Sequence, residues 1–151
     1  MDQPISIARY GLAYLFWAIS VALAFVALLV WRSTAFIILG MTPWDRYAEH
    51  ALNQFGFLFL AIVILGVIIF AENYFRTGIE RNRLLPRFFL IALIEVAAIW
   101  IAHVIQWIGG MVLGFPESLV SPVILILELA AVILFFVLRR RFTKRTITTS
   151  L

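Results

Sequence analysis

Apolar residues run along the chain in four long blocks, with polar residues gathered between them. The blocks cover about residues 11–31, 53–75, 87–108 and 119–138. Each is close to the length of roughly 20 helical residues that crosses a bilayer core about 30 Å thick. Strands of a membrane β-barrel would alternate apolar and polar residues, whereas these blocks are continuously apolar. The pattern predicts an all-α integral membrane protein, a small bundle of four transmembrane helices that forms a single domain over residues 1–151.

Composition supports the membrane assignment. Of the 151 residues, 64% are hydrophobic and 13% are charged, whereas soluble domains carry roughly 25% charged residues. Too few polar residues are present to cover a soluble core, so the bilayer is expected to surround the helices. The net charge of +4 would suggest nucleic acid in a soluble protein. Here the basic residues lie beside apolar blocks, which favours anionic lipids as partners and argues against nucleic acid.

Basic residues also predict the orientation. Ten of the twelve lie near the termini or between the second and third blocks, and only Arg32 and Arg46 lie elsewhere. The positive-inside rule then places both termini and the 76–87 loop in the cytoplasm, in the cytoplasmic (inner) membrane of a cell. The residues expected to contact anionic lipid or a partner subunit on this side are Arg76, Arg81, Arg83, Arg87, Arg139, Arg140 and Arg141.

Two segments outside the blocks have predicted structures of their own. In the first outer loop, apolar and aromatic residues of segment 43–52 recur at helical spacing, which predicts an interfacial helix or an extension of the second span. At the other end of that span, Glu72 and Arg76 fall at helical pair spacing, so the helix is expected to continue into the cytoplasm. The basic tail 143–151 has no apolar period and is predicted to be frayed.

Polar residues inside the blocks are the candidate functional residues. Glu95 and Gln106 lie about 20° apart around the third helix, and His103 lies about 80° from Glu95. Alanines at 92, 98 and 102 flank the Glu95 line. Small residues let helix backbones approach closely, so this face is expected to pack on another helix.

Glu128 is the second carboxyl group placed near the bilayer midplane. The connection between the third and fourth blocks is short, so these helices are predicted to be antiparallel neighbours. Glu95 and Glu128 are then expected to face each other and to share a proton or bind a cation. The alternative is that both acids only hold helices together or meet a partner chain.

His103 offers a third interpretation. Imidazole ligates haem iron and hydrogen-bonds quinone carbonyls, and Trp100, Gln106 and Trp107 lie close to His103 in sequence. These four residues are the predicted quinone contacts. Haem b is the other cofactor considered, with His50 on the outer side as a distant companion histidine, and no metal site is expected otherwise.

Reaction motifs are absent from the sequence. It has no phosphate-binding glycine loop, no HExxH and no cysteine. We therefore predict a non-catalytic accessory subunit of a larger membrane complex, with no cofactor of its own and other membrane subunits as partners. A respiratory or photosynthetic electron-transfer assembly is the expected parent. The alternatives are a small oligomeric proton-coupled transporter and a quinone- or haem-binding membrane anchor.

Overall fold

Four long helices make up the structure. The computed structural model describes residues 7–41, 43, 45–80, 83–114 and 122–148. The helices are α1 (Ile7–Gly40), α2 (Arg46–Glu80), α3 (Leu84–Val112) and α4 (Pro122–Thr148). Each is long and apolar enough to cross a membrane. The prediction of an all-helical protein with four such helices is confirmed.

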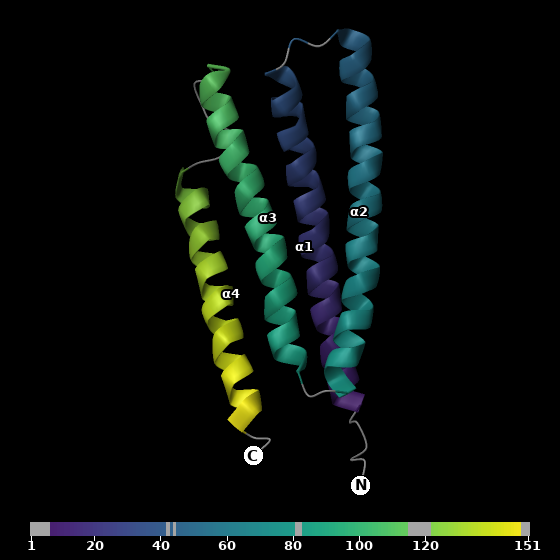
Figure 1. Cartoon of the computed structure of the whole chain (residues 1–151), viewed down its shortest axis with the longest axis vertical. Helices are drawn as coiled ribbons and strands as arrows, with labels where there is room; N and C mark the ends of the chain where they lie inside the picture. The colour runs from purple at the N-terminus through teal and green to yellow at the C-terminus, as the bar shows by residue number, and fades with distance from the viewer. Residues whose placement is uncertain (1–6, 42, 44, 81–82, 115–121, 149–151) are drawn as a thin grey trace.

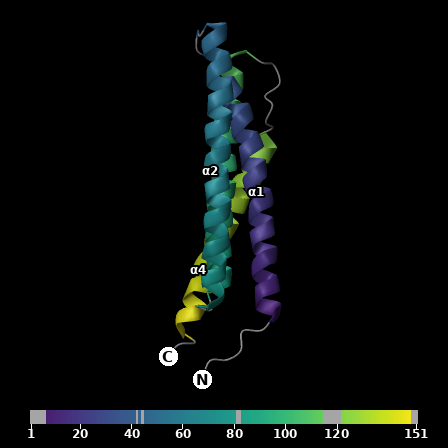
Figure 2. The same cartoon turned by 90° about the vertical axis from the view of Figure 1, so that its right-hand side faces the viewer.

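The helices stand side by side in the order α4, α3, α1, α2 (Figure 1). Seen from the α2 side, α2 covers much of the rest of the molecule (Figure 2). Helix α3 packs on α4 and α1, α1 packs on α2, and α2 also touches α3. Within the described residues, α4 packs on α3 alone. The two outer helices of this row therefore have one flank turned away from the chain.

The helix ends alternate between the two ends of the row. The start of α1, the end of α2, the start of α3 and the end of α4 lie at the same end (Figure 1). We call this the basic end, because it carries Arg76, Arg83, Arg87 and the Arg139, Arg140, Arg141 cluster. Helices α1 and α3 consequently run parallel to each other, although α2 separates them in sequence.

Small residues line the contact between α1 and α3. On α1 the buried residues Ser20, Ala24, Ala27 and Thr34 follow one another at helical spacing. On α3 the buried face comprises Ala92, Glu95, Ile99, Ala102, Gln106 and Gly109. Alternating steps of three and four residues are the spacing that keeps one helix face against a parallel neighbour. The predicted small-residue face of α3 therefore packs on α1.

Aromatic rings join all four helices at the basic end. Phe88 of α3 stacks on Phe16 of α1 at 4.3 Å between ring centroids and lies 6.4 Å from Phe75 of α2. The neighbouring Phe89 stacks on Phe142 of α4 at 5.5 Å. Phe75 is also part of a small buried core with Ala71 and Ile91. This end is where α2 comes closest to α3.

The three largest differences from the predicted helix boundaries are at the end of α1, the start of α2 and the end of α4. Residues 46–52 form the first turns of α2. The structure therefore has the predicted extension of the second span and no separate interfacial helix over 43–52 among the described residues. No glycine or proline interrupts this stretch, so nothing stops the helix there. For the same reason α1 continues through the apolar run to Gly40.

The third difference is at the carboxyl end, where a frayed tail was predicted over 143–151. Helix α4 continues through Thr148, and residues 149–151 lie outside the described residues. The Thr143 hydroxyl donates to the Arg139 carbonyl one turn earlier. The missing apolar period therefore does not end this helix.

At Gly109 the backbone of α3 lies against Ile37 of α1. A Cβ added there would lie 2.5 Å from Ile37 Cγ2, whereas one added at the neighbouring Gly110 would have open space. Ile37 is β-branched, so its Cγ2 cannot swing away without moving the side chain or the helix. The bare backbone at Gly109 is therefore a requirement of the α1–α3 contact.

We expect Gly109→Ala to lower the free energy of unfolding by about 1–3 kcal/mol, because of this overlap. Gly110→Ala is the matched control, and its greater helix propensity should leave stability unchanged or raised. Reversible unfolding in mixed detergent measures both. Adding Ile37→Ala, which removes Cγ2, should make Gly109→Ala harmless. Equal stability of the two alanine variants would contradict the close approach.

Candidate functional site

The polar residues of α3 form the candidate site, and we call Glu95, His103 and Gln106 the polar seam. Glu95 lies on the buried face toward α1, with 6% of its surface exposed. The Ser20 hydroxyl donates a hydrogen bond of 2.6 Å to Glu95 Oε1. Glu95 Oε2 is buried and has no hydrogen-bond partner within the described chain. One oxygen of this carboxyl group is thus bound to α1 and the other is not.

Gln106 makes a second connection to α1, nearer the end opposite the basic end. Its Nε2 donates to Thr34 Oγ1 and to the Val30 carbonyl, both at 3.0 Å. Thr34 Oγ1 itself lies 2.8 Å from the Val30 carbonyl and 3.4 Å from the Ala102 carbonyl. Side-chain and backbone groups of both helices are therefore joined in one network. Both donors of the Gln106 amide are used in this network.

His103 faces the opposite neighbour, α4. Its Nδ1 lies 2.7 Å from Glu128 Oε1, and each of the two side chains is 18% exposed. Trp100, one turn earlier on α3, donates from Nε1 to the Leu125 carbonyl of α4 at 3.1 Å. The second oxygen of Glu128 is buried and has no hydrogen-bond partner in the described part of the chain. An imidazole and a carboxyl group so placed can exchange a proton.

The expectation that Glu95 and Glu128 face each other is wrong for this structure. Glu95 binds Ser20 of α1, and Glu128 binds His103. His103 lies eight residues beyond Glu95 on α3, a rise of about 12 Å along the helix axis. The antiparallel register of α3 and α4 brings Glu128 to the level of the histidine. The two acids therefore belong to two separate pairs.

The four predicted quinone contacts point to different neighbours. Gln106 is bound to α1, whereas Trp100 and His103 are bound to α4. Trp107 is only partly buried. His50, the companion considered for haem, lies in the first turns of α2 with its Nε2 3.1 Å from Gln54 Nε2. Quinone or haem b binding stays a prediction, and a visible absorption spectrum with quinone extraction of the purified protein checks it.

Basic residues predicted to contact lipid or a partner have unequal surroundings. Arg76, Arg83, Arg140 and Arg141 are exposed, and Arg139 is partly buried. Arg87 binds the Tyr74 carbonyl and lies over the Tyr74 ring, 4.5 Å from its centroid. This arginine joins α3 to α2, so part of its guanidinium group is bound within the chain and is not available to lipid or to a partner. Arg81 lies outside the described residues.

Ser20 and Thr34 are site residues that the sequence analysis missed. They are ordinary hydroxyl residues in an apolar block, and no charge draws attention to them. A signal was nevertheless present, because they lie fourteen residues apart and so only about 40° apart around a helix. Two hydroxyl groups on one face of an apolar helix indicate a polar helix contact.

A metal centre is not indicated among the described residues. No group of three or more His, Asp or Glu side chains lies close enough there to hold an ion. The chemistry available in the polar seam is hydrogen bonding between helices, together with proton exchange in the His103–Glu128 pair.

A double-mutant cycle tests the Ser20–Glu95 contact. Ser20→Ala and Glu95→Met each remove one partner of the hydrogen bond. The cycle should give a coupling energy of about 0.6 kcal/mol and at most about 1.7 kcal/mol, which are the average and the maximum for hydrogen bonds between membrane helices. Ser33→Ala is the control, because the exposed Ser33 hydroxyl bonds only to Leu29 in its own helix. Coupling of Glu95 to Ser33 as large as to Ser20 would contradict the assignment.

The chain was compared with protein-family models, curated proteins and solved structures, and none of the three comparisons gave a match. Function is therefore inferred from the polar contacts and the arrangement of the helices.

Proposed function

We propose that this chain is a non-catalytic structural subunit of a larger membrane complex. The observation that carries the proposal is the open row of helices. In the most apolar stretch of α4 no residue is buried within the chain. In the corresponding stretch of α2 only 6% of the residues are buried, against 28% for α1 and for α3. Helices α2 and α4 thus pack on the inner helices along one side only, and their other side is open to lipid or to other membrane proteins.

The use of the polar seam supports a structural role. Glu95 and Gln106 hold α3 to α1, and His103 holds it to α4. Polar groups engaged in this way stabilise a rigid pair of inner helices. The inner pair then acts as a support on which α2 and α4 present apolar surface to partner subunits.

Finer parts of the proposal rest on the sequence. A respiratory or photosynthetic electron-transfer assembly is the proposed parent, because the chain is short, apolar and without a reaction motif. The cytoplasmic (inner) membrane, with both termini on the cytoplasmic side, is the proposed location because of the basic residues. Other membrane subunits and anionic lipids are the proposed partners.

Photo-crosslinking in the native membrane tests the subunit proposal. A photoreactive residue replaces Phe59 of α2 or Ile126 of α4, which are 69% and 67% exposed and so equally available to lipid. We expect at least one position to crosslink to a specific larger membrane subunit. Gentle extraction, size analysis and mass spectrometry should then find that same subunit in constant ratio with the unmodified chain.

A matched control replaces Ala102, which is fully buried between α1 and α3, and should give only crosslinks within the chain. Crosslinks to lipid alone at both outer positions, from a chain that migrates as a small homo-oligomer, would contradict the subunit proposal.

The His103–Glu128 pair favours a second candidate, a proton-coupled carrier working as an oligomer. The observation that favours this carrier is the 2.7 Å contact between the His103 imidazole and the Glu128 carboxyl group at the α3–α4 interface. Ionisable residues inside membranes commonly mark proton pathways. The proposed proton site of this candidate is the His103–Glu128 pair instead of a Glu95–Glu128 pair, because Glu95 binds Ser20.

Proteoliposomes with a trapped pH-sensitive dye measure this candidate. If the chain carries protons, Glu128→Gln should reduce the flux at least tenfold, because an amide cannot release a proton. Glu95→Gln should leave most of it, because Glu95 belongs to a different pair. Absence of proton flux from the unmodified chain, under a gradient of either sign, would remove the carrier.

A further inference from the structure

The carboxyl group of Glu95 is incompletely hydrogen-bonded in the middle of an apolar bundle. Its Oε1 accepts from the Ser20 hydroxyl, whereas its Oε2 is buried and has no hydrogen-bond partner in the described chain. Only 6% of the residue is exposed. An ionised carboxylate would leave a charged oxygen there without a donor, and burying a charge costs more than burying a neutral polar group. The contact therefore favours the carboxyl group with its proton bound.

The described helices bring no opposite charge to Glu95. Around its level they hold no other titratable residue, over residues 15–31, 51–71, 88–94, 96–102 and 129–138. The titratable residues that end these stretches are Tyr14 and Arg32 on α1, His50 and Glu72 on α2, Arg87 and His103 on α3, and Glu128 and Arg139 on α4. The two on α3 are each eight residues from Glu95, about 12 Å along the helix axis. A charge on Glu95 would thus have no ion-pair partner among the described residues.

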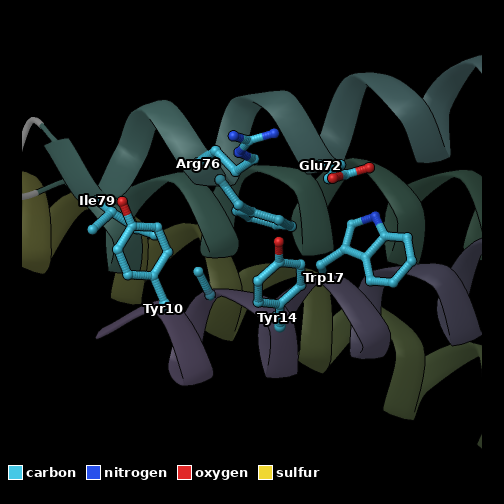
Figure 3. Close-up of a pocket in the computed structure, with 8 residues that line it drawn as sticks. Tyr10, Tyr14, Trp17, Glu72, Arg76 and Ile79 are labelled. Atoms are coloured by element: carbon cyan, nitrogen blue, oxygen red, sulfur yellow. The ribbon is translucent and has the colours of Figure 1, made fainter. Parts of the chain in front are cut away.

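Water has little room to approach Glu95 from the basic end. Ile91, one turn nearer that end, belongs to the small buried core. Between α1 and α2, Tyr14 and Trp17 line a pocket together with Glu72 (Figure 3). This pocket has a volume of about 10 Å³, which is room for about one water molecule. The described side chains therefore leave no wide path from this end to the carboxyl group.

We propose that Glu95 is a proton-binding site that controls how the two halves of the chain are joined. The halves are the α1–α2 and α3–α4 hairpins, and the α1–α3 contact is the main connection between them. With the proton bound, the carboxyl group is neutral and fits this contact. Without it, the carboxylate is stabilised only where it meets water or headgroups, so α1 and α3 have to separate around Ser20. The proposal is independent of the structural role proposed above.

Proton linkage gives the direction of the effect. The joined state holds one more proton than the separated state, so rising pH favours separation. Above about pH 4.3, where a glutamate in water is ionised, the equilibrium constant for separation should rise by up to about tenfold per pH unit. Gln106 has no ionisable group, and its bonds to Thr34 and Val30 hold their part of the contact at every pH. Separation is therefore expected around Ser20 and Glu95.

Infrared spectroscopy of the full chain tests for the proton. The protein is reconstituted in ether-linked lipids, whose spectra lack the ester carbonyl band. At about pH 7 we expect a carbonyl band of a protonated carboxyl group that Glu95→Gln removes and Glu128→Gln leaves in place. Ser20→Ala should keep this band and move it to higher frequency, because the carbonyl loses its hydrogen bond.

Distances between spin labels test the joint. The chain has no cysteine, so Ile19→Cys on α1 and Ile94→Cys on α3 give one labelled pair across the contact, at positions 39% and 60% exposed. This distance should lengthen as the pH rises from about 5 to about 9, and Glu95→Gln should abolish the change. A control pair at Leu29 of α1 and Leu58 of α2 lies within one hairpin and should keep its distance.

Two results would overturn the proposal. Absence of the protonated band from the unmodified chain at about pH 7, or its survival in Glu95→Gln, would mean that Glu95 is ionised in the contact. An α1–α3 distance that stays constant with pH, or that changes equally in Glu95→Gln, would mean that the proton does not control the joint. The band and the pH dependence of the unmodified chain remain decisive even where a variant fails to fold.

Discussion

The close contact between α1 and α3 is the constraint on which the rest of the structure depends. It joins two helices that are not consecutive in sequence, and it has small side chains along both faces, with no room for a Cβ at Gly109. Lipid tails are as apolar as the helices, so burial alone gives little reason for two helices to associate in a membrane. Close backbone packing and the hydrogen bonds of Glu95 and Gln106 supply that reason here.

This contact also explains why the helices form an open row. Helix α3 turns its small-residue face to α1, and the face with Trp100 and His103, about 80° to 140° further around, meets α4. Helix α2 packs mainly on α1, and at the basic end it also contacts α3, through Arg87 and the phenylalanine cluster. The outer helices are placed by α1 and α3 and do not meet within the described residues. In this arrangement the outward sides of α2 and α4 pack on no other described helix of the chain.

Much of the architecture follows from the sequence alone. Continuous apolar blocks give four membrane-spanning helices, because the backbone in lipid must satisfy its own hydrogen bonds. Helix ends are harder to predict, since hydropathy stops at the first polar residues, whereas the helix of residues 46–52 continues until something interrupts it. The buried face around Glu95 was predictable from its alanines. The shared face of Ser20 and Thr34 indicated a polar contact on the first helix, but the sequence did not say which helix covers the Glu95 face.

The His103–Glu128 pair shows a different limit. Counting residues from the ends of the apolar blocks placed Glu128 level with Glu95, but the register of two antiparallel helices depends on where each helix turns back. Helix α3 continues to Val112, beyond the end of its apolar block. Because α3 is longer by one turn, each residue of α4 lies opposite a later residue of α3 than the block ends predict. Glu128 therefore lies opposite His103.

The parallel pairing of α1 with α3 has a consequence for how the chain enters the membrane. Because α1 is made first, the Ser20 hydroxyl is already in the bilayer when the segment with Glu95 arrives. An isolated helix would carry its acid into hydrocarbon with no partner, at a cost of roughly 2.5–3.5 kcal/mol. The Ser20 hydroxyl of the first helix gives the acid of the third helix a partner inside the chain.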